Sequence, residues 1–389
     1  MTVGAVVDLR DRHTWNPAEV ALDAFAWPTR VPVVQLREVA ESLNTDATVS
    51  RGTPTISPSG LDPLFGGVLR RTHEYQGAAY MVHSDRQSDG LAAGDVLVPA
   101  SSEAHVLLVT PDLVGSVVGP TFQAFRVLLG DPLWLWGVLN STAGKRMREL
   151  LSGIRSIEGH TRDQMLQARI PWPPLAMQHD LAPAISNVLN STLGREEAAV
   201  ETWWRTIDLT TVDWRSALAA PDPSALRDGE PLASLCTGIR RGNVRRADML
   251  ESPQSGSVPV SDIALLAGKE ARRWCMATER MVVAAEGDVL VAAVGERNYA
   301  SLARGATAVD RNVYALRPRD ATHAPALVRY LNGPAGHARR RFLLSGTTVR
   351  SLRSAELAQL PVPADDLQQP VDVDALAPLH ERLQDLLWI

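Results

Sequence analysis

The sequence predicts an α+β protein made of two tandem, pseudo-symmetric mixed α/β domains, each followed by a long helix. A segment that runs from Leu-Leu-Ser-Gly to Pro-x-Pro spans 150–173 and recurs at 343–363. A Gly-Asp-Val-Leu-Val stretch at 94–98 recurs at 287–291. These landmarks keep their order at offsets of 190 to 193 residues, which indicates a long internal repeat. The alternative is one large α/β domain with coincidental turn dipeptides.

The composition indicates a folded protein that is long enough for two or three domains. Of its 389 residues, 45% are hydrophobic and 21% are charged, as in globular rather than disordered proteins. No apolar run in the sequence approaches the roughly 18 residues that cross a bilayer. Residues 1–12 lack the basic and then apolar pattern of a secretory signal. We therefore expect a cytoplasmic protein.

The basic residues are unevenly distributed. A net charge of −5 argues mildly against nucleic-acid binding. However, 37 of the 39 basic residues are arginines, and many of them are adjacent in the sequence. Part of this bias is typical of a GC-rich genome, but the clustering is informative because arginine grips phosphate and the guanine edge with two hydrogen bonds. The clusters are Arg70-Arg71, Arg240-Arg241, Arg245-Arg246, Arg272-Arg273 and Arg339-Arg340-Arg341.

The first half of the chain can be followed element by element. Residues 1–30 are expected to form an accessory segment, in which Asn16 caps a short helix that Pro17 opens. The first domain covers 31–174, where short β-type stretches separated by turn residues predict a curled mixed sheet. Within it, residues 132–147 are apolar on most faces, which predicts a buried helix.

Apolar residues at helical spacing predict a long helix after each domain. The first helix covers 175–209, and a linker at 210–228 leads to the second domain at 229–365. The second helix covers 366–389. The apolar stripes that we expect to pack the helices together and to bind a partner protein are formed by Leu181, Ile185, Val188, Leu189, Leu376, Leu379, Leu383 and Leu386.

Local motifs of catalysis and of metal binding are absent from the sequence. Gly268-Lys269 lacks the upstream glycine of a phosphate-binding loop, because position 263 is Ile. No Gly-x-Ser-x-Gly or His-Glu-x-x-His occurs, and the nine histidines are scattered. Cys236 and Cys275 are expected to be buried free thiols. We therefore expect a binding scaffold without catalytic residues, metal or cofactor of its own.

The order of these landmarks resembles the specificity subunit of type I restriction–modification enzymes. That family carries two target-recognition domains in one chain, each with a Gly-Asp strand and a Ser-Gly turn. Each domain ends in a hydrophobic-Pro-x-Pro-Pro-Leu-x-x-Gln signature, which here reads from Ile170 to Gln178. The second copy keeps Leu360 to Pro363 and is degenerate at 364–368. The resemblance covers roughly 31–389.

The resemblance implies a non-catalytic subunit that reads two DNA half-sites separated by an unread spacer. Its helices would dock methyltransferase (modification) subunits, which would supply the S-adenosylmethionine chemistry, and a restriction subunit with ATP-driven translocation would join later. Base reading requires side chains on loops near the Gly-Asp strand. The candidates are Arg70, Arg71, Arg86, Gln87, Arg240, Arg241, Arg245, Arg246, Arg272, Arg273, Arg297 and Asn298. We expect Arg339 to Arg341 to clamp phosphate or to act as a helix-end charge.

Three other hypotheses remain open at this stage. The chain could be a specificity-like scaffold of another phage-defence system, with the same fold and a different effector. It could be an enzyme whose site is assembled in space, which would require a deep pocket lined by titratable groups with shifted pKa values. It could also be an interaction scaffold that does not bind DNA.

Overall fold

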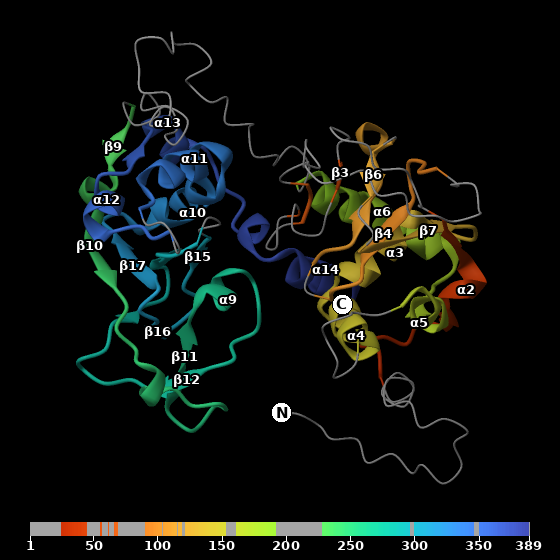
Figure 1. The fold of residues 1–389 in the computed structure, drawn as a ribbon, viewed down its shortest axis with the longest axis horizontal. Helices are drawn as coiled ribbons and strands as arrows, with labels where there is room; N and C mark the ends of the chain where they lie inside the picture. Colours follow the sequence, from red (N-terminus) through yellow and green to blue (C-terminus); the bar gives the residue numbers. More distant parts are fainter. Residues whose placement is uncertain are drawn as a thin grey trace, which may run out of the picture. The chain divides into compact units, whose positions relative to one another are not determined.

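The computed structural model of the chain contains two compact units (Figure 1). Unit 1 consists of Met1–Glu196 together with Ala377–Ile389, and unit 2 consists of Glu197–Leu376. Each unit is described by itself. The structure describes residues 25–44, 55–56, 61, 66–68, 90–102, 104–114, 116–118, 121–152, 161–191, 228–295, 299–345 and 350–388.

Unit 1 is a mixed α/β structure. Its strands are β1 (Val33–Gln35), β2 (Ala40–Leu43), β3 (Thr55–Ile56), β4 (Val96–Pro99), β5 (Leu107–Leu108), β6 (Val117–Val118), β7 (Phe122–Val127) and β8 (Arg169–Pro171). Its helices are α2 (Leu36–Val39), α3 (Pro132–Asn140), α4 (Thr142–Ser152), α5 (Arg162–Gln167), α6 (Leu175–Asn190) and α14 (Leu379–Leu387).

The central sheet of unit 1 is antiparallel, with the strand order β2-β7-β4-β5. Two smaller sheets accompany it, the antiparallel pair β1-β8 and the parallel pair β3-β6. Strand β4 is buried at every position, as expected for a central strand covered on both faces. One face packs against α3, whose residues Trp134, Leu135 and Trp136 are almost completely buried, and the same core receives residues of α6 and α14.

Unit 2 contains the remaining elements. Its strands are β9 (Glu230–Pro231), β10 (Cys236–Arg241), β11 (Ser257–Ser261), β12 (Trp274–Met276), β13 (Val283–Ala284), β14 (Val289–Ala292), β15 (Ala300–Leu302), β16 (Thr307–Val309), β17 (Val313–Pro318) and β18 (Pro361–Val362). Its helices are α8 (Leu232–Leu235), α9 (Ile263–Leu266), α10 (Ala324–Asn332), α11 (Pro334–Leu343), α12 (Ser354–Ala358) and α13 (Ala364–Gln368).

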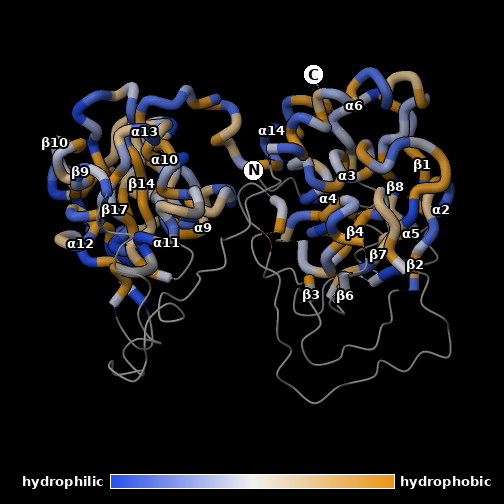
Figure 2. Tube along the Cα trace, turned by 90° about the horizontal axis from the view of Figure 1, so that it is seen from above, coloured by the Kyte–Doolittle hydropathy of each residue, from blue (hydrophilic) through white to orange (hydrophobic). Residues whose placement is uncertain are grey.

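The central sheet of unit 2 has the order β10-β17-β14-β15 and is also antiparallel throughout. A second sheet, β12-β11-β16-β13, contains the parallel pair β11-β16, and β18 pairs with β9. Figure 2 shows that hydrophobic residues concentrate on β14 and β17 in this unit and on β4 and β7 in unit 1. The mixed α/β fold that the sequence predicts is therefore confirmed.

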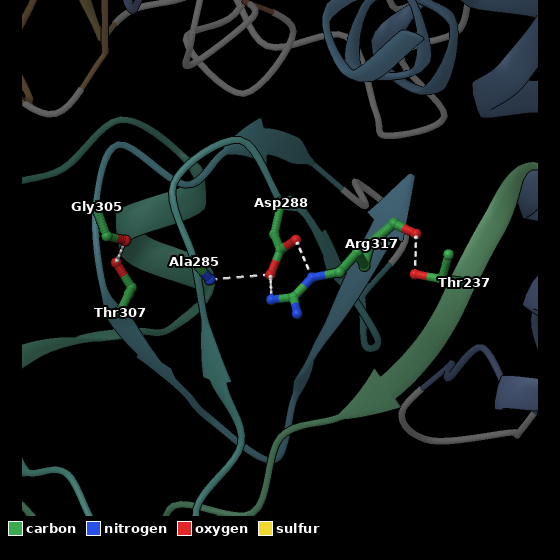
Figure 3. A network of polar contacts seen from close by, with 6 residues as sticks. All are labelled: Thr237, Ala285, Asp288, Gly305, Thr307 and Arg317. Atoms are coloured by element: carbon green, nitrogen blue, oxygen red, sulfur yellow. Dashed lines mark hydrogen bonds and ion pairs between the residues drawn. The ribbon is translucent and has the colours of Figure 1, made fainter. Parts of the chain in front are cut away.

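The two central sheets match in strand order and in their internal polar contacts. In unit 1, Arg126 donates to both carboxylate oxygens of the buried Asp95, at 2.9 and 2.8 Å. In unit 2, Arg317 forms the same two bonds with the buried Asp288, at 3.0 and 2.8 Å (Figure 3). Each carboxylate also accepts a backbone N–H three residues upstream. The Gly-Asp landmark is thus a buried ion pair that joins two neighbouring strands.

A Leu-Asn pair at 139–140, which recurs at 331–332, makes matching contacts in the two units. The amide of Asn140 accepts from the N–H of Val106 and donates to its carbonyl, and both bonds are 2.8 Å long. Asn332 holds Ala300 in the same way, at 2.9 and 2.7 Å. Each side chain therefore ties the end of a helix to the start of a strand, because it pairs with both backbone groups of one residue.

A short turn between two helices, α3 and α4 or α10 and α11, follows each asparagine. A Cβ on Gly144 would lie 2.0 Å from the carbonyl oxygen of Val138, and one on Gly336 would lie 2.1 Å from that of Tyr330, so neither position accepts a larger residue. A fully buried arginine, Arg148 or Arg340, hydrogen-bonds a carbonyl at the end of the preceding helix. Burial lowers their pKa values, that of Arg148 to about 10 and that of Arg340 to about 9.

The long helices differ from their predicted extents. Helix α6 ends at Asn190, and the remainder of the predicted 175–209 helix lies outside the described residues. No single helix forms over 366–389. That segment holds α13, a 3-10 turn at Asp374–Leu376 and α14, since Pro370 and Pro378 interrupt the helical backbone.

Two features of the local secondary structure differ from the β-type stretches that the sequence predicts. The stretch 31–39 combines β1 with the single-turn helix α2. The polar segments before each Pro-x-Pro are the short helices α5 and α12. The helix predicted within 1–30 lies outside the described residues except at its last residue. In the part of the chain that the structure describes, no helix is both long and apolar enough to cross a membrane.

Candidate nucleic-acid interface

A two-residue link, Gly242-Asn243, joins the end of β10 to Val244, which forms an isolated bridge with Asp310. The N–H of Gly242 donates to Val313, and a Cβ at this position would lie 2.1 Å from the carbonyl oxygen of Asp310. The side chain of Asn243 donates to the carbonyl of Arg280 at 2.7 Å and accepts from the N–H of Val282 at 2.9 Å. The link therefore holds three turns together: the end of β10, the turn before β13 and the turn between β16 and β17.

Each of these three turns carries exposed arginines. Arg240 and Arg241 end β10, Arg280 precedes β13, and Arg311 lies between β16 and β17. We call these four residues the arginine group. All four are exposed, so their guanidinium groups are accessible to a ligand. The arrangement suits a polyanion, because arginine binds phosphate through a planar fork of donors.

Arg240 and Arg241 leave opposite faces of β10, because successive side chains on a strand alternate. Arg240 pairs with Ala315 across the ladder, and Arg241 pairs with Tyr314. The Nε of Arg241 donates to the carbonyl of Arg311 at 2.7 Å, and its guanidinium carbon lies 5.8 Å from the centre of the Tyr314 ring. Arg241 is therefore oriented by the protein, whereas none of the described residues makes such a contact with Arg240.

The other two predicted arginine pairs lie along the second sheet. An isolated bridge between Leu250 and Trp274 brings the segment that follows Arg245-Arg246 beside the segment that follows Arg272-Arg273. Arg245 forms an ion pair with Asp248 at 3.2 Å, and Arg273 forms one with Glu251 at 3.0 Å. These pairs are exposed and contribute little to stability, so DNA can compete for the two arginines.

The remaining predicted DNA contacts cannot be placed. Half of the twelve candidates lie outside the described residues, namely Arg70, Arg71, Arg86, Gln87, Arg297 and Asn298. The candidate interface is therefore formed by residues of unit 2.

Arg339 and Arg340 do not form the phosphate clamp that was one of the two roles expected for 339–341, but Arg340 fits the other role, a charge at a helix end, because it bonds a carbonyl in the last turn of α10. The side chain of Arg341 lies outside the described residues. Arg340 is 1% exposed and donates to the carbonyl of Leu331, so it cannot reach a phosphate. Arg339 donates to the hydroxyl of Tyr330 and to the carbonyl of Pro361, both at 3.1 Å. These two side chains hold α11 against its own unit.

The apolar stripes of the helices are used inside the units. Ile185, Leu379 and Leu383 are completely buried in the core of unit 1, where α6 and α14 pack on α3. Their burial there leaves them unavailable to a partner protein. The other residues of the two stripes have similar surroundings: Val188 and Leu189 are buried in the same core, Leu181 and Leu386 pack against it, and Leu376 packs against the core of unit 2.

Arg280 and Arg311 were missed by the sequence analysis. Each is an isolated arginine, and the two lie far along the chain from Arg240-Arg241. The signal that could have found them is the Gly-Asn pair at 242–243, since glycine allows close backbone approach and asparagine bonds backbone groups in turns. The sequence does not show which turns the Gly-Asn pair joins, because that depends on the fold.

Within the described ranges, few other side chains have the properties of a catalytic or metal-binding site. No cluster of three or more His, Cys, Asp or Glu residues that could hold a metal ion occurs among the residues that the structure describes. Burial raises the pKa of Cys236 to about 11, and it also raises the pKa of Cys275. A thiol with a raised pKa is a poor nucleophile at neutral pH.

Comparison with known proteins gave matches among solved structures alone. No protein-family model matches the chain, and neither does any curated protein. The HsdS subunit from Thermoanaerobacter tengcongensis is 20% identical over 92% of this chain and 89% of its own, with a TM-score of 0.33. A structure described by the complex assembly and conformational transition of the type I restriction–modification system is 20% identical over 88% of this chain and 89% of its own, with a TM-score of 0.30. The type I S subunit from M. genitalium is 12% identical over 92% of each chain, with a TM-score of 0.26. Two of these three structures are described as belonging to type I restriction–modification systems.

Proposed function

We propose that this chain is the DNA-recognition subunit of a type I restriction–modification complex or of a related phage-defence complex. In this proposal each unit presents one reading surface, and the chain recognises two short half-sites separated by a spacer. Arginine side chains supply the phosphate contacts and part of the base contacts.

The observation that carries the proposal is a repeated internal frame with different exposed residues. The ion pair of Asp288 and its counterpart in unit 1 keep their geometry. The exposed residues directly after the matched strands do not agree: Leu128-Leu129 follows β7, whereas Arg319-Asp320 follows β17. A chain that must read two unrelated sequences needs this combination, because the frame sets the fold while the surface sets the specificity.

The chemistry of modification is assigned to partner proteins. In this proposal methyltransferase subunits bind the S-adenosylmethionine and carry out catalysis, a restriction subunit with translocase activity can join, and the chain itself contributes no catalytic residue. Because the predicted helix stripes are largely buried within their units, the docking surface must lie on other residues.

The experiment is co-purification with the methyltransferase encoded beside this chain, followed by selection from a random-sequence DNA duplex pool. Enrichment of a split motif is the expected result. A stable complex that enriches no motif would contradict DNA recognition and leave an assembly role. If no complex forms and no DNA is retained at low salt, the proposal fails altogether.

Competition with salt provides a second readout of the same proposal. Phosphate contacts release counterions, so the logarithm of the affinity should fall linearly with the logarithm of the salt concentration, by about 0.9 for each contact. A quadruple alanine variant of Arg240, Arg245, Arg246 and Arg280 should flatten this slope. An unchanged slope would show that none of these four arginines contacts a phosphate.

A further inference from the structure

We propose that Arg241 is a specificity-determining residue of unit 2 that reads a guanine, while Arg311 beside it contacts the flanking phosphate. This inference rests on the proposed function and adds a role for each member of one arginine pair. It comes from a difference between two guanidinium groups that the fold brings to the same place.

The first step is that Arg241 is held in place before any ligand binds. Its Nε donates to the carbonyl of Arg311, and its guanidinium lies against the ring of Tyr314. Tyr314 is itself fully buried, and its hydroxyl donates to the carbonyl of Leu352 at 2.9 Å. The ring is therefore a fixed platform, and a stacked arginine has little rotational freedom.

The second step concerns the donors that remain on Arg241. The carbonyl of Arg311 occupies the Nε donor, and the described part of the chain contains no hydrogen-bond partner for the two Nη groups. The residue is exposed, so these groups face solvent. Two parallel donors match the O6 and N7 acceptors of guanine in the major groove, and no other base presents two acceptors there.

The third step is the contrast with Arg311. Its backbone carbonyl holds Arg241, while its own side chain is exposed and has no partner in the described residues. A guanidinium with no partner in the described residues, beside a fixed fork, suits a phosphate, whose position varies less with sequence than a base edge. Orientation before binding matters because an immobilised long side chain costs about 0.5 to 1.5 kcal/mol. Arg241 has already lost much of that freedom.

Arg241 could instead grip a phosphate with two hydrogen bonds, since its fork also matches phosphate. The two roles make different predictions. A base reader discriminates one base pair, whereas a phosphate contact weakens all sequences equally. Arg241→Lys separates them, because lysine keeps the charge and loses the fork.

The experiment uses the full complex and the motif that the wild-type protein enriches. Arg241→Lys should lose its preference for one G·C pair in one half-site by about 10- to 100-fold, with the salt slope unchanged. Arg311→Ala should weaken binding to all sequences alike and reduce the slope by about 0.9. Arg329→Lys, at an arginine of α10 that bonds the carbonyl of Asp366 in its own unit, is the matched control and should retain the guanine preference. Thermal unfolding of each variant checks that unit 2 is folded.

The inference is overturned if Arg241→Lys enriches the wild-type motif unchanged, if it behaves like Arg311→Ala, or if neither wild-type half-site contains a G·C pair. Those outcomes leave the proposed function intact, because the wild-type protein has enriched a split motif. A wild-type protein that enriches no motif contradicts the proposed function instead, and the two failures are therefore distinguishable.

Discussion

The carboxylate of Asp288 shows how one buried residue can organise a strand pair. Its side chain is 8% exposed, accepts from Arg317 on β17 and from the backbone N–H of Ala285, and so joins a turn to a strand (Figure 3). The hydrogen bonds that Arg317 donates to Asp288 raise the pKa of Arg317, which is itself 58% exposed. The two partners differ in exposure, because the carboxylate of Asp288 is buried whereas the guanidinium of Arg317 is exposed to solvent.

This asymmetry predicts unequal effects of the two substitutions. Asp288→Ala should lower the free energy of unfolding of unit 2 by about 2 kcal/mol, because the N–H of Ala285 and the guanidinium of Arg317 both lose their acceptor. Arg317→Ala should cost more, about 3 kcal/mol, because it leaves the buried carboxylate of Asp288 without its ion-pair partner. Denaturant titration measures both. Glu251→Ala, which breaks an exposed ion pair, is the control and should change stability by under about 0.5 kcal/mol. Equal effects of all three variants would contradict this account.

The two thiols should be inert in the folded protein. Cys236 is 3% exposed and Cys275 is fully buried, and burial raises the pKa of both. Since the thiolate is the reactive form, we expect no alkylation by iodoacetamide at pH 8 until denaturant is added. Rapid labelling of the native protein, detected by mass spectrometry, would show that the buried sites open readily.

The raised pKa of Cys236 also has a consequence for stability. In the unfolded chain the thiol titrates near its ordinary value of 9.0, and in the folded chain at about 11. Between these values the unfolded state binds fewer protons, so stability should fall as pH rises from 9 to 11, by at most about 3 kcal/mol from this group. Cys236→Ala should remove this part of the fall.

At the scale of elements, the sequence analysis succeeded where a residue's requirement is local. Gly94 and Gly287 have φ values of 94° and 83°, a region that favours glycine, so each Gly-Asp pair marks a turn before a strand. Each Pro-x-Pro landmark lies at the end of a short strand, β8 or β18, because proline lacks the backbone N–H that a continuing strand would donate. These requirements depend on neighbours in sequence, and the repeat could therefore be recognised.

Contacts that depend on packing between segments distant in the sequence could not be predicted. The spacing of Leu379 and Leu383 identified an amphipathic helix, but it carries no information on which core receives it. The arginine group was likewise only partly found, because Arg280 and Arg311 reach Arg241 through backbone contacts that no local pattern encodes. Six of the twelve candidate contacts lie outside the described residues and stay predictions.

Gln178, the last residue of the family-like signature, has a structural role. It is 1% exposed, accepts from the N–H of Asp131 and donates to the carbonyl of Pro173, both at 2.8 Å. It thereby fastens the start of α6 to the loop before α3. Gln368 occupies the matching position after the second Pro-x-Pro and is exposed.

These two glutamines form a matched pair for mutagenesis. Gln178→Ala should destabilise unit 1 by about 1 to 3 kcal/mol, because it leaves a buried N–H and a carbonyl unpaired. Gln368→Ala should change the stability of unit 2 by no more than about 0.5 kcal/mol. Denaturant melts followed by tryptophan fluorescence can compare them. An equal loss in both variants would argue against the clamp.

At the scale of the whole molecule, unit 1 is discontinuous in sequence. Its last part, Ala377–Ile389, follows unit 2 along the chain. Helix α14 contributes Leu379 and Leu383 to the unit 1 core, and the side chain of Gln384 accepts from the N–H of Ala143 at the start of α4 at 2.9 Å. Unit 2 is thus inserted between two parts of one core.

This insertion makes unit 1 dependent on a distant segment. Deleting Ala377–Ile389 should unfold unit 1 and spare unit 2, and Leu383→Ala alone should cost unit 1 about 2 to 5 kcal/mol. Hydrogen exchange with mass spectrometry resolves the two units. Val373→Ala, at an exposed site, is the control. Loss of protection in unit 2 after the deletion would contradict the division.

The nested arrangement also governs the order in which the protein can be made. A ribosome releases the first 196 residues of unit 1 long before it releases α14, whereas every residue of unit 2 emerges before that helix. Domains usually fold from the N-terminal end as they are synthesised. In this chain unit 1 is the first to begin synthesis and the last to be completed. The apolar core residues of its first part therefore stay exposed until unit 2 has been synthesised and α14 has emerged.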